Sequence, residues 1–109
     1  MITKLAVYGT LKQGKLLHWY LNGTPLLTTD KLNGILHFDV TEELPALTKG
    51  TKIVDVEVYN LDEKVLNNIT RMEENAGYIR KLITLHSGLQ AYCFFYPTIK
   101  DSFQEINEY

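Results

Sequence analysis

The sequence predicts an α+β fold: a small barrel-like sheet of mixed or antiparallel strands, one main α-helix and a short second helix. Three observations support this class. Several short segments have the apolar runs or the alternation typical of strands, one longer segment has the helical period, and turns that contain glycine separate them. With 109 residues, we expect one domain over 1–109, with a peripheral tail over 98–109.

In the first half of the chain, apolar runs and the glycines that interrupt them define the expected elements. They are a buried strand over 5–8 that stops at Gly9, a turn over 10–15, a short helix over 16–21, a strand over 32–40 and a loop with a brief extended piece over 42–50. The loop is expected because Pro45 has no N–H to donate to a sheet.

Three further strands are expected in the second half. Apolar and acidic residues alternate over 53–59, the pattern of a half-buried strand. Strands over 78–86 and 89–96 flank the dipeptide S-G, which favours a tight hairpin. The remaining tail is polar and acidic.

Residues 62–74 predict the main helix. Asn60 or Asp62 can cap its start, and Gly77 can supply the left-handed residue that often ends a helix. At about 100° per residue, four apolar side chains fall on one face, which we expect to pack on the sheet. They are Val65, Leu66, Ile69 and Met72.

Glu73 falls inside this apolar sector, whereas Glu63 and Glu74 point towards water. Burying a carboxylate costs free energy unless the group is paired or used in chemistry. Two interpretations therefore stand beside each other. Glu73 either pairs with Arg71, Arg80 or a tyrosine hydroxyl, or it serves as a catalytic acid or base with a raised pKa.

The segment Tyr8, Gly9, Thr10 and Leu11 comes directly after a strand and turns at once. Such a turn can direct several backbone N–H groups to one point, where they bind an anion such as a carboxylate. Glycine would leave that backbone open to a ligand. The other interpretation is that the segment is only a turn, because it lacks the glycine spacing and the Lys-Ser/Thr ending of a phosphate-binding loop.

Composition argues against several classes of function and predicts where the protein is located. Eleven Lys and Arg oppose thirteen Asp and Glu, a net charge of −2, which argues against a nucleic-acid partner. The single cysteine, Cys93, favours a reducing compartment, and the chain has neither a membrane-length apolar run nor a signal-peptide pattern, so we expect a cytoplasmic protein. His18, His37 and His86 lack the spacing of metal ligands, so no metal is expected.

Five segments in order resemble the gamma-glutamylcyclotransferase-like (AIG2-like) family. V-Y-G-T-L-K at 7–12 is similar to its opening Y-G-[ST]-L, L-P-A-L at 44–47 to its P-A segment, and V-E-V-Y at 56–59 to its G-E-V-Y strand. I-T-R-M-E at 69–73 is similar to the helix end L-D-x-x-E, and Y-I-R at 78–80 to Y-x-R. Two positions depart from the family pattern: valine replaces the glycine of G-E-V-Y, and threonine stands where aspartate is usual.

The resemblance implies an enzyme that converts a γ-glutamyl amine or γ-glutamyl amino acid to 5-oxoproline and a free amine. In this reaction, classed as aminoacyl transfer or as a lyase-type cyclisation, Glu73 would be the catalytic acid/base. The turn over 8–11 would hold the substrate carboxylate, Tyr78 would line the pocket, and Arg80 could orient Glu73 or have a structural role. No cofactor and only a small-molecule partner are implied.

Two other functions remain open. The chain could be a binding module that captures a glutamate-like molecule without turning it over, or a plain structural or interaction domain. Neither the amine half of the substrate nor the oligomeric state follows from the sequence.

Overall fold

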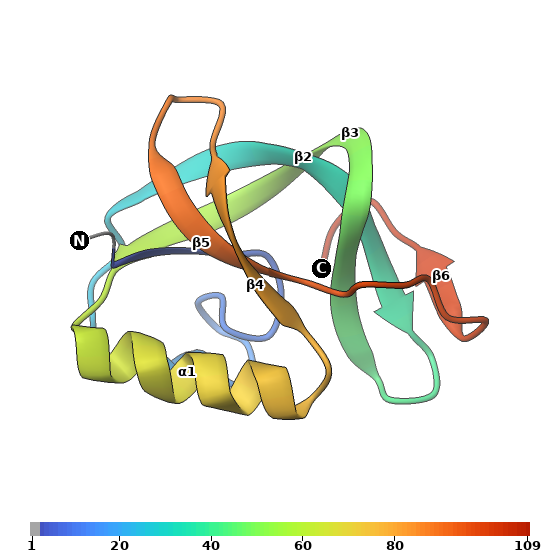
Figure 1. Cartoon of the computed structure of the whole chain (residues 1–109), viewed down its shortest axis with the longest axis horizontal. Helices are drawn as coiled ribbons and strands as arrows, with labels where there is room; N and C mark the ends of the chain where they lie inside the picture. Colours follow the sequence, from blue (N-terminus) through green and yellow to red (C-terminus); the bar gives the residue numbers. More distant parts are fainter. Residues whose placement is uncertain (1–2) are drawn as a thin grey trace.

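The computed structural model describes residues 3–109, in which six strands form one mixed sheet that curls into a half-barrel with the main helix beside it (Figure 1). The strand order is β4-β5-β1-β3-β2-β6, with β1 and β5 parallel and the other neighbours antiparallel. In chain order the elements are β1 (Lys4–Val7), η1 (His18–Leu21), β2 (Thr28–Asp39), β3 (Leu44–Asn60), α1 (Glu63–Asn75), β4 (Ile79–Thr84), β5 (Gln90–Phe95) and β6 (Phe103–Glu105). The predicted fold class is confirmed. The start of the chain, considered above for a signal peptide, includes residues 1 and 2, which lie outside the described part.

The expected loop over 42–50 is wrong, because strand β3 already begins at Leu44 and pairs with β2 from its first residue. The register shifts once, between Gly34 and Ile35 of β2. Pro45 is tolerated because β1 pairs only with the far end of β3, at Glu57–Asn60. At Pro45 the strand therefore has β2 as its neighbour on one side, and the other side needs no N–H donor.

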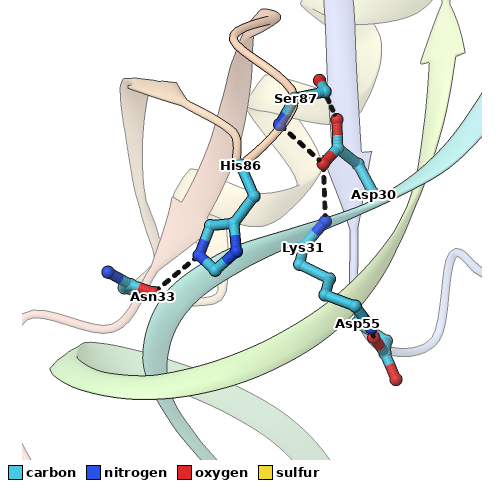
Figure 2. Close-up of polar contacts among 6 residues, drawn as sticks. All are labelled: Asp30, Lys31, Asn33, Asp55, His86 and Ser87. Carbon is cyan, nitrogen blue, oxygen red and sulfur yellow. Dashed lines mark hydrogen bonds and ion pairs between the residues drawn. The ribbon is translucent and has the colours of Figure 1, made fainter.

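The β4–β5 hairpin contacts β2 although β1 and β3 separate them in the sheet order, which requires the sheet to curl. At the hairpin tip, His86 N–H donates to the Lys31 carbonyl at 2.9 Å, and His86 Nε2 lies 2.7 Å from Asn33 Oδ1. The hydroxyl and N–H of Ser87 both donate to the Asp30 carboxylate (Figure 2). These bonds connect the tip of the hairpin to β2.

Helix α1 begins and ends as predicted. The Asp62 carboxylate caps it by accepting the N–H of Lys64 at 2.8 Å, and Gly77, at φ +96°, donates its N–H to the Glu74 carbonyl. The predicted inward face is confirmed as well: Glu74 is exposed, and the buried residues of the helix are Leu66, Ile69 and Glu73.

The short second helix is confined to the single 3-10 turn η1, shorter than the predicted 16–21. Asn22 adopts a left-handed conformation at φ 53° and donates its N–H to the Trp19 carbonyl, which ends the turn. At the other end of the chain, β6 adds an edge strand to β2, and Ile106 N–H donates to the Leu36 carbonyl at 2.9 Å. No helix in residues 3–109 is long and apolar enough to cross a membrane.

Leu66 connects α1 to the sheet, since it is 3% exposed and belongs to a core cluster that β1, β3, η1 and β5 share. We expect Leu66→Ala to lower the free energy of unfolding by roughly 2–5 kcal/mol, because the lost contacts leave a cavity that the sheet cannot fill. Denaturant titration measures this change. Leu16→Ala is the matched control: its side chain is 78% exposed, and the expected change is below about 0.5 kcal/mol. Equal losses in the two variants would contradict the packing described here.

Candidate functional site

A cavity of about 60 Å³ lies between the turn that follows β1 and the C-terminal end of α1. Apolar side chains make up most of its wall, and Glu73 supplies the carboxylate. The lining residues are Ala6, Val7, Tyr8, Gly9, Thr10, Leu11, Leu17, Leu44, Pro45, Met72, Glu73, Ala76, Tyr78 and Phe94. The structure thus brings five of the predicted site residues and Glu73 around one small space.

The turn after β1 keeps its amides free. Its three carbonyls each accept a hydrogen bond, which fixes the peptide planes. The donors are Lys12 N–H to Gly9 O (3.0 Å), Leu17 N–H to Thr10 O (2.9 Å) and His18 Nδ1 to Leu11 O (2.9 Å). By contrast, the N–H groups of Gly9, Thr10 and Leu11 donate to no acceptor within residues 3–109. Because buried backbone donors are almost always paired, these amides are suited to an anionic ligand.

Gly9 has a different structural role from the expected one. A Cβ at this position would lie 2.4 Å from Pro45 Cγ, far inside van der Waals contact. The missing side chain therefore makes room for Pro45 at the start of β3. Pro45 in turn forms part of the cavity wall.

Glu73 extends from the last turn of α1 into the cavity wall and is 8% exposed. Within residues 3–109, its carboxylate takes part in no ion pair, and no hydrogen bond contributes to its pKa. Because no fully buried side-chain oxygen in this part of the chain lacks a partner, the Glu73 oxygens are open to the cavity. Burial without a partner disfavours the charged form and raises the pKa of Glu73 from 4.5 to about 7. A carboxyl group with this pKa can gain and lose a proton near neutral pH.

The structural pairing considered for Glu73 is not found. Arg80 is occupied elsewhere: its Nη1 lies 3.3 Å from Thr70 Oγ1, and its guanidinium carbon lies 4.3 Å from the centre of the Tyr92 ring. Arg71 is exposed. The structure does not bring Arg80 to the cavity, and its role stays a prediction.

The two tyrosines of the cavity bond to backbone carbonyls. Tyr8 OH donates to Phe94 O, and Tyr78 OH donates to Pro45 O, both at 2.7 Å. Burial raises the pKa of both hydroxyls well above 10, so they stay protonated. Tyr78 lines the cavity with its ring, as expected, but neither hydroxyl is free to bind Glu73.

Sequence reasoning missed several contributors to the site. Leu17, Ala76 and Phe94 line the cavity, and His18 bonds to the turn. No motif in the sequence marks these residues, because they come together only in the folded chain. The helical pattern did place Met72 beside Glu73. Among residues 3–109, no group of three or more His, Cys, Asp and Glu side chains could hold a metal ion.

The sequence of this chain matches a known protein family. The model of the family described as "Gamma-glutamyl cyclotransferase, AIG2-like" matches residues 5–108, so the chain belongs to this family. A protein of Pyrococcus horikoshii named "Putative gamma-glutamylcyclotransferase" is 43% identical over 76 residues. The match covers 69% of this chain and 63% of that relative, which is less than two thirds of the relative's length.

Solved structures share the fold. The crystal structure of an uncharacterized protein from Pyrococcus horikoshii superposes with a TM-score of 0.82 at 32% identity, covering 96% of this chain and 86% of the other. A mouse AIG2-like protein gives 0.71 at 20% identity, covering 99% and 88%. Kluyveromyces lactis allophanate hydrolase gives 0.81 at 22% identity; 97% of this chain matches 19% of that longer one. At these lower identities the likeness shows the fold alone.

Proposed function

We propose that this chain converts a γ-glutamyl amine or γ-glutamyl amino acid to 5-oxoproline and a free amine. The observation that carries the proposal is the shared cavity: a carboxyl group whose pKa burial raises to about 7 lines the same space as three residues whose backbone amides are free. Family membership supports a cyclotransferase-like role, and the substrate and the role of each residue are our proposal.

In this reaction the substrate supplies its own nucleophile. The α-amino nitrogen attacks the γ-carbonyl carbon, a new C–N bond closes the five-membered ring, and the bond from that carbon to the leaving nitrogen breaks. The α-ammonium group gives up two protons as it becomes the ring amide, one before the attack and one as the ring closes. Glu73 accepts them in turn and passes them to the leaving nitrogen, which departs as an ammonium ion, so no proton is gained or lost overall. Holding the folded substrate in this geometry lowers the barrier by several kcal/mol, because attack is intramolecular.

The raised pKa of Glu73 suits this exchange. An α-amino group has a pKa near 8, and an ordinary glutamate near 4.3 is too weak a base to deprotonate it efficiently. With the Glu73 pKa at about 7, the two groups are closely matched, so the proton can pass in both directions at low cost. The amides of Gly9, Thr10 and Leu11 would bind the substrate carboxylate, and they would also donate hydrogen bonds to the oxyanion that develops on the γ-carbonyl oxygen.

Release of 5-oxoproline from a panel of γ-glutamyl compounds tests the proposal. We expect 5-oxoproline and free amine in equal amounts, detected by chromatography, and a rise in the unfolding temperature on adding 5-oxoproline itself. Protection against heat without any product would instead favour the binding module. If neither product nor protection against heat is observed, a structural or interaction domain is the interpretation that remains.

A further inference from the structure

The tail that follows β6 runs back to the turn after β1, and its end lies beside that turn (Figure 1). β6 pairs with β2, and directly after it Ile106 N–H donates to Leu36 O at 2.9 Å. Ile106 and Tyr109 also pack against the core cluster that contains Leu36 and Tyr8. These contacts fix the tail to β2 and to the core.

Two lysines that follow the turn reach Tyr109 at the end of this tail. Lys12 Nζ donates to the main-chain oxygen of Tyr109 at 2.7 Å, and Lys15 Nζ lies 4.9 Å from the centre of the Tyr109 ring. The same ring stacks on Phe38 of β2 at 6.3 Å. A hydrogen bond from an ammonium group is stronger than one between neutral groups. This bond joins residues 97 positions apart, and it connects the turn to β2 and β6, which are not neighbours of β1 in the sheet.

The main chain of Lys12 closes the turn whose amides are free. Because its N–H donates to Gly9 O at 3.0 Å, a movement of Lys12 also moves the peptide planes of the turn. The side chain of Lys12 does not line the cavity that contains Glu73. It lines a separate space of about 170 Å³, together with Tyr8 and Tyr109. Lys12 is therefore placed to act on the turn and not on a molecule in the cavity.

The acidic side chains beside Lys12 do not hold its ammonium group. Asp55 and Glu108 line the same space, but Asp55 forms an ion pair with Lys31, and Glu108 is exposed. Within residues 3–109, Lys12 forms no ion pair, and its ammonium group makes one hydrogen bond, to Tyr109 O. The bond to the tail is therefore what fixes this side chain.

We infer that Lys12 is a positioning residue, which holds the three free amides of the turn in place through its bond to Tyr109. The inference rests on the proposed function, in which these amides bind the substrate carboxylate. Backbone donors bind an anion best when they are already fixed, because ordering them during binding costs free energy. Loss of the Lys12–Tyr109 bond therefore weakens substrate binding more than it slows proton transfer by Glu73, which lies on α1.

Steady-state kinetics of 5-oxoproline release test this role by comparing Lys12→Met with Lys12→Arg. Methionine keeps the apolar stem but donates no hydrogen bond, whereas arginine can still donate to Tyr109 O. We expect Lys12→Met to raise KM by roughly tenfold, the usual effect of one hydrogen bond from a charged group, and to change kcat less. Lys12→Arg should restore most of the loss. Lys49→Met is the matched control, since Lys49 is exposed and forms no ion pair within residues 3–109.

A double-mutant cycle with Tyr109→Ala tests whether Lys12 acts through the tail. That substitution frees the end of the tail, because the ring contacts with Phe38 and Lys15 are lost. Lys12→Met should then raise KM much less in the Tyr109→Ala background than in the wild type. Effects that multiply independently would overturn the inference, because Lys12 would then act without the tail. Thermal unfolding of each variant verifies the fold.

NMR relaxation of the turn amides in the ligand-free protein separates this inference from the proposed function. We expect order parameters of about 0.85 in the wild type and values falling towards roughly 0.6 in Lys12→Met. A turn loosened in this way, without 5-oxoproline from the wild type, would retain the positioning by Lys12 and end the proposed reaction. Product formation with a wild-type KM in folded Lys12→Met would overturn the positioning and retain the reaction. An unchanged turn in Lys12→Met, with no product from the wild type, would overturn both.

Discussion

Glu73→Gln is expected to lower kcat for 5-oxoproline formation by about 10²–10⁴-fold, the usual loss when a general acid/base is removed. Glutamine keeps the size of the side chain but cannot accept the proton of the α-amino group. The turn over residues 8–11 would still bind the substrate carboxylate, so KM should change less than kcat. Initial rates over a range of substrate concentrations measure the two parameters separately.

Glu74→Gln is the matched control, because Glu74 is the next residue of α1 and is exposed. We expect that variant to keep wild-type turnover. Full activity in a folded Glu73→Gln protein would end the catalytic role of Glu73. Equal losses in both variants would point to a general electrostatic effect of the helix end.

The orientation of Glu73 could be predicted from the sequence because it depends on one local period. Val65, Leu66, Ile69 and Met72 define a face, and Glu73 falls within it whatever the helix packs on. The turn after β1 was predictable for a similar reason, since the apolar run and the glycine adjoin one another. Both features are set by residues close together in the chain.

The surroundings of Glu73 could not be predicted in this way. Sequence alone left open a pairing with Arg80, and only the fold directs Arg80 to Thr70 and Tyr92 instead. The same limit applies to Pro45. Its local sequence predicts a loop, but in the structure it lies in β3 and contacts Gly9, which is distant in the sequence. The absence of a partner for a buried charge is a property of tertiary structure.

Because the buried carboxyl group of Glu73 has no partner, we expect Glu73→Gln to change the stability of the protein. In the folded protein, burial raises the pKa of Glu73 from 4.5 to about 7. Between these two values the folded state keeps a proton that the unfolded chain loses, so the free energy of unfolding of the wild type falls as the pH rises through this window. The cost of holding the buried charge is then complete above pH 7. Glutamine is neutral at every pH, so the Glu73→Gln variant does not carry this cost.

Glu73→Gln should therefore be more stable than the wild type at pH 8, by on the order of 3 kcal/mol, at about 1.4 kcal/mol per pH unit. Near pH 4 the two proteins should differ little, because Glu73 is then neutral in the folded state. Denaturant unfolding at several pH values between 4 and 8 measures the difference, with Glu74→Gln as the flat reference. If the Glu73→Gln variant is less stable than the wild type at pH 8, the Glu73 carboxylate must stabilise the fold through a partner. Its raised pKa would then no longer support a role as proton carrier. A gain in stability together with a loss of turnover would show that the protein keeps Glu73 for its chemistry at the expense of its fold.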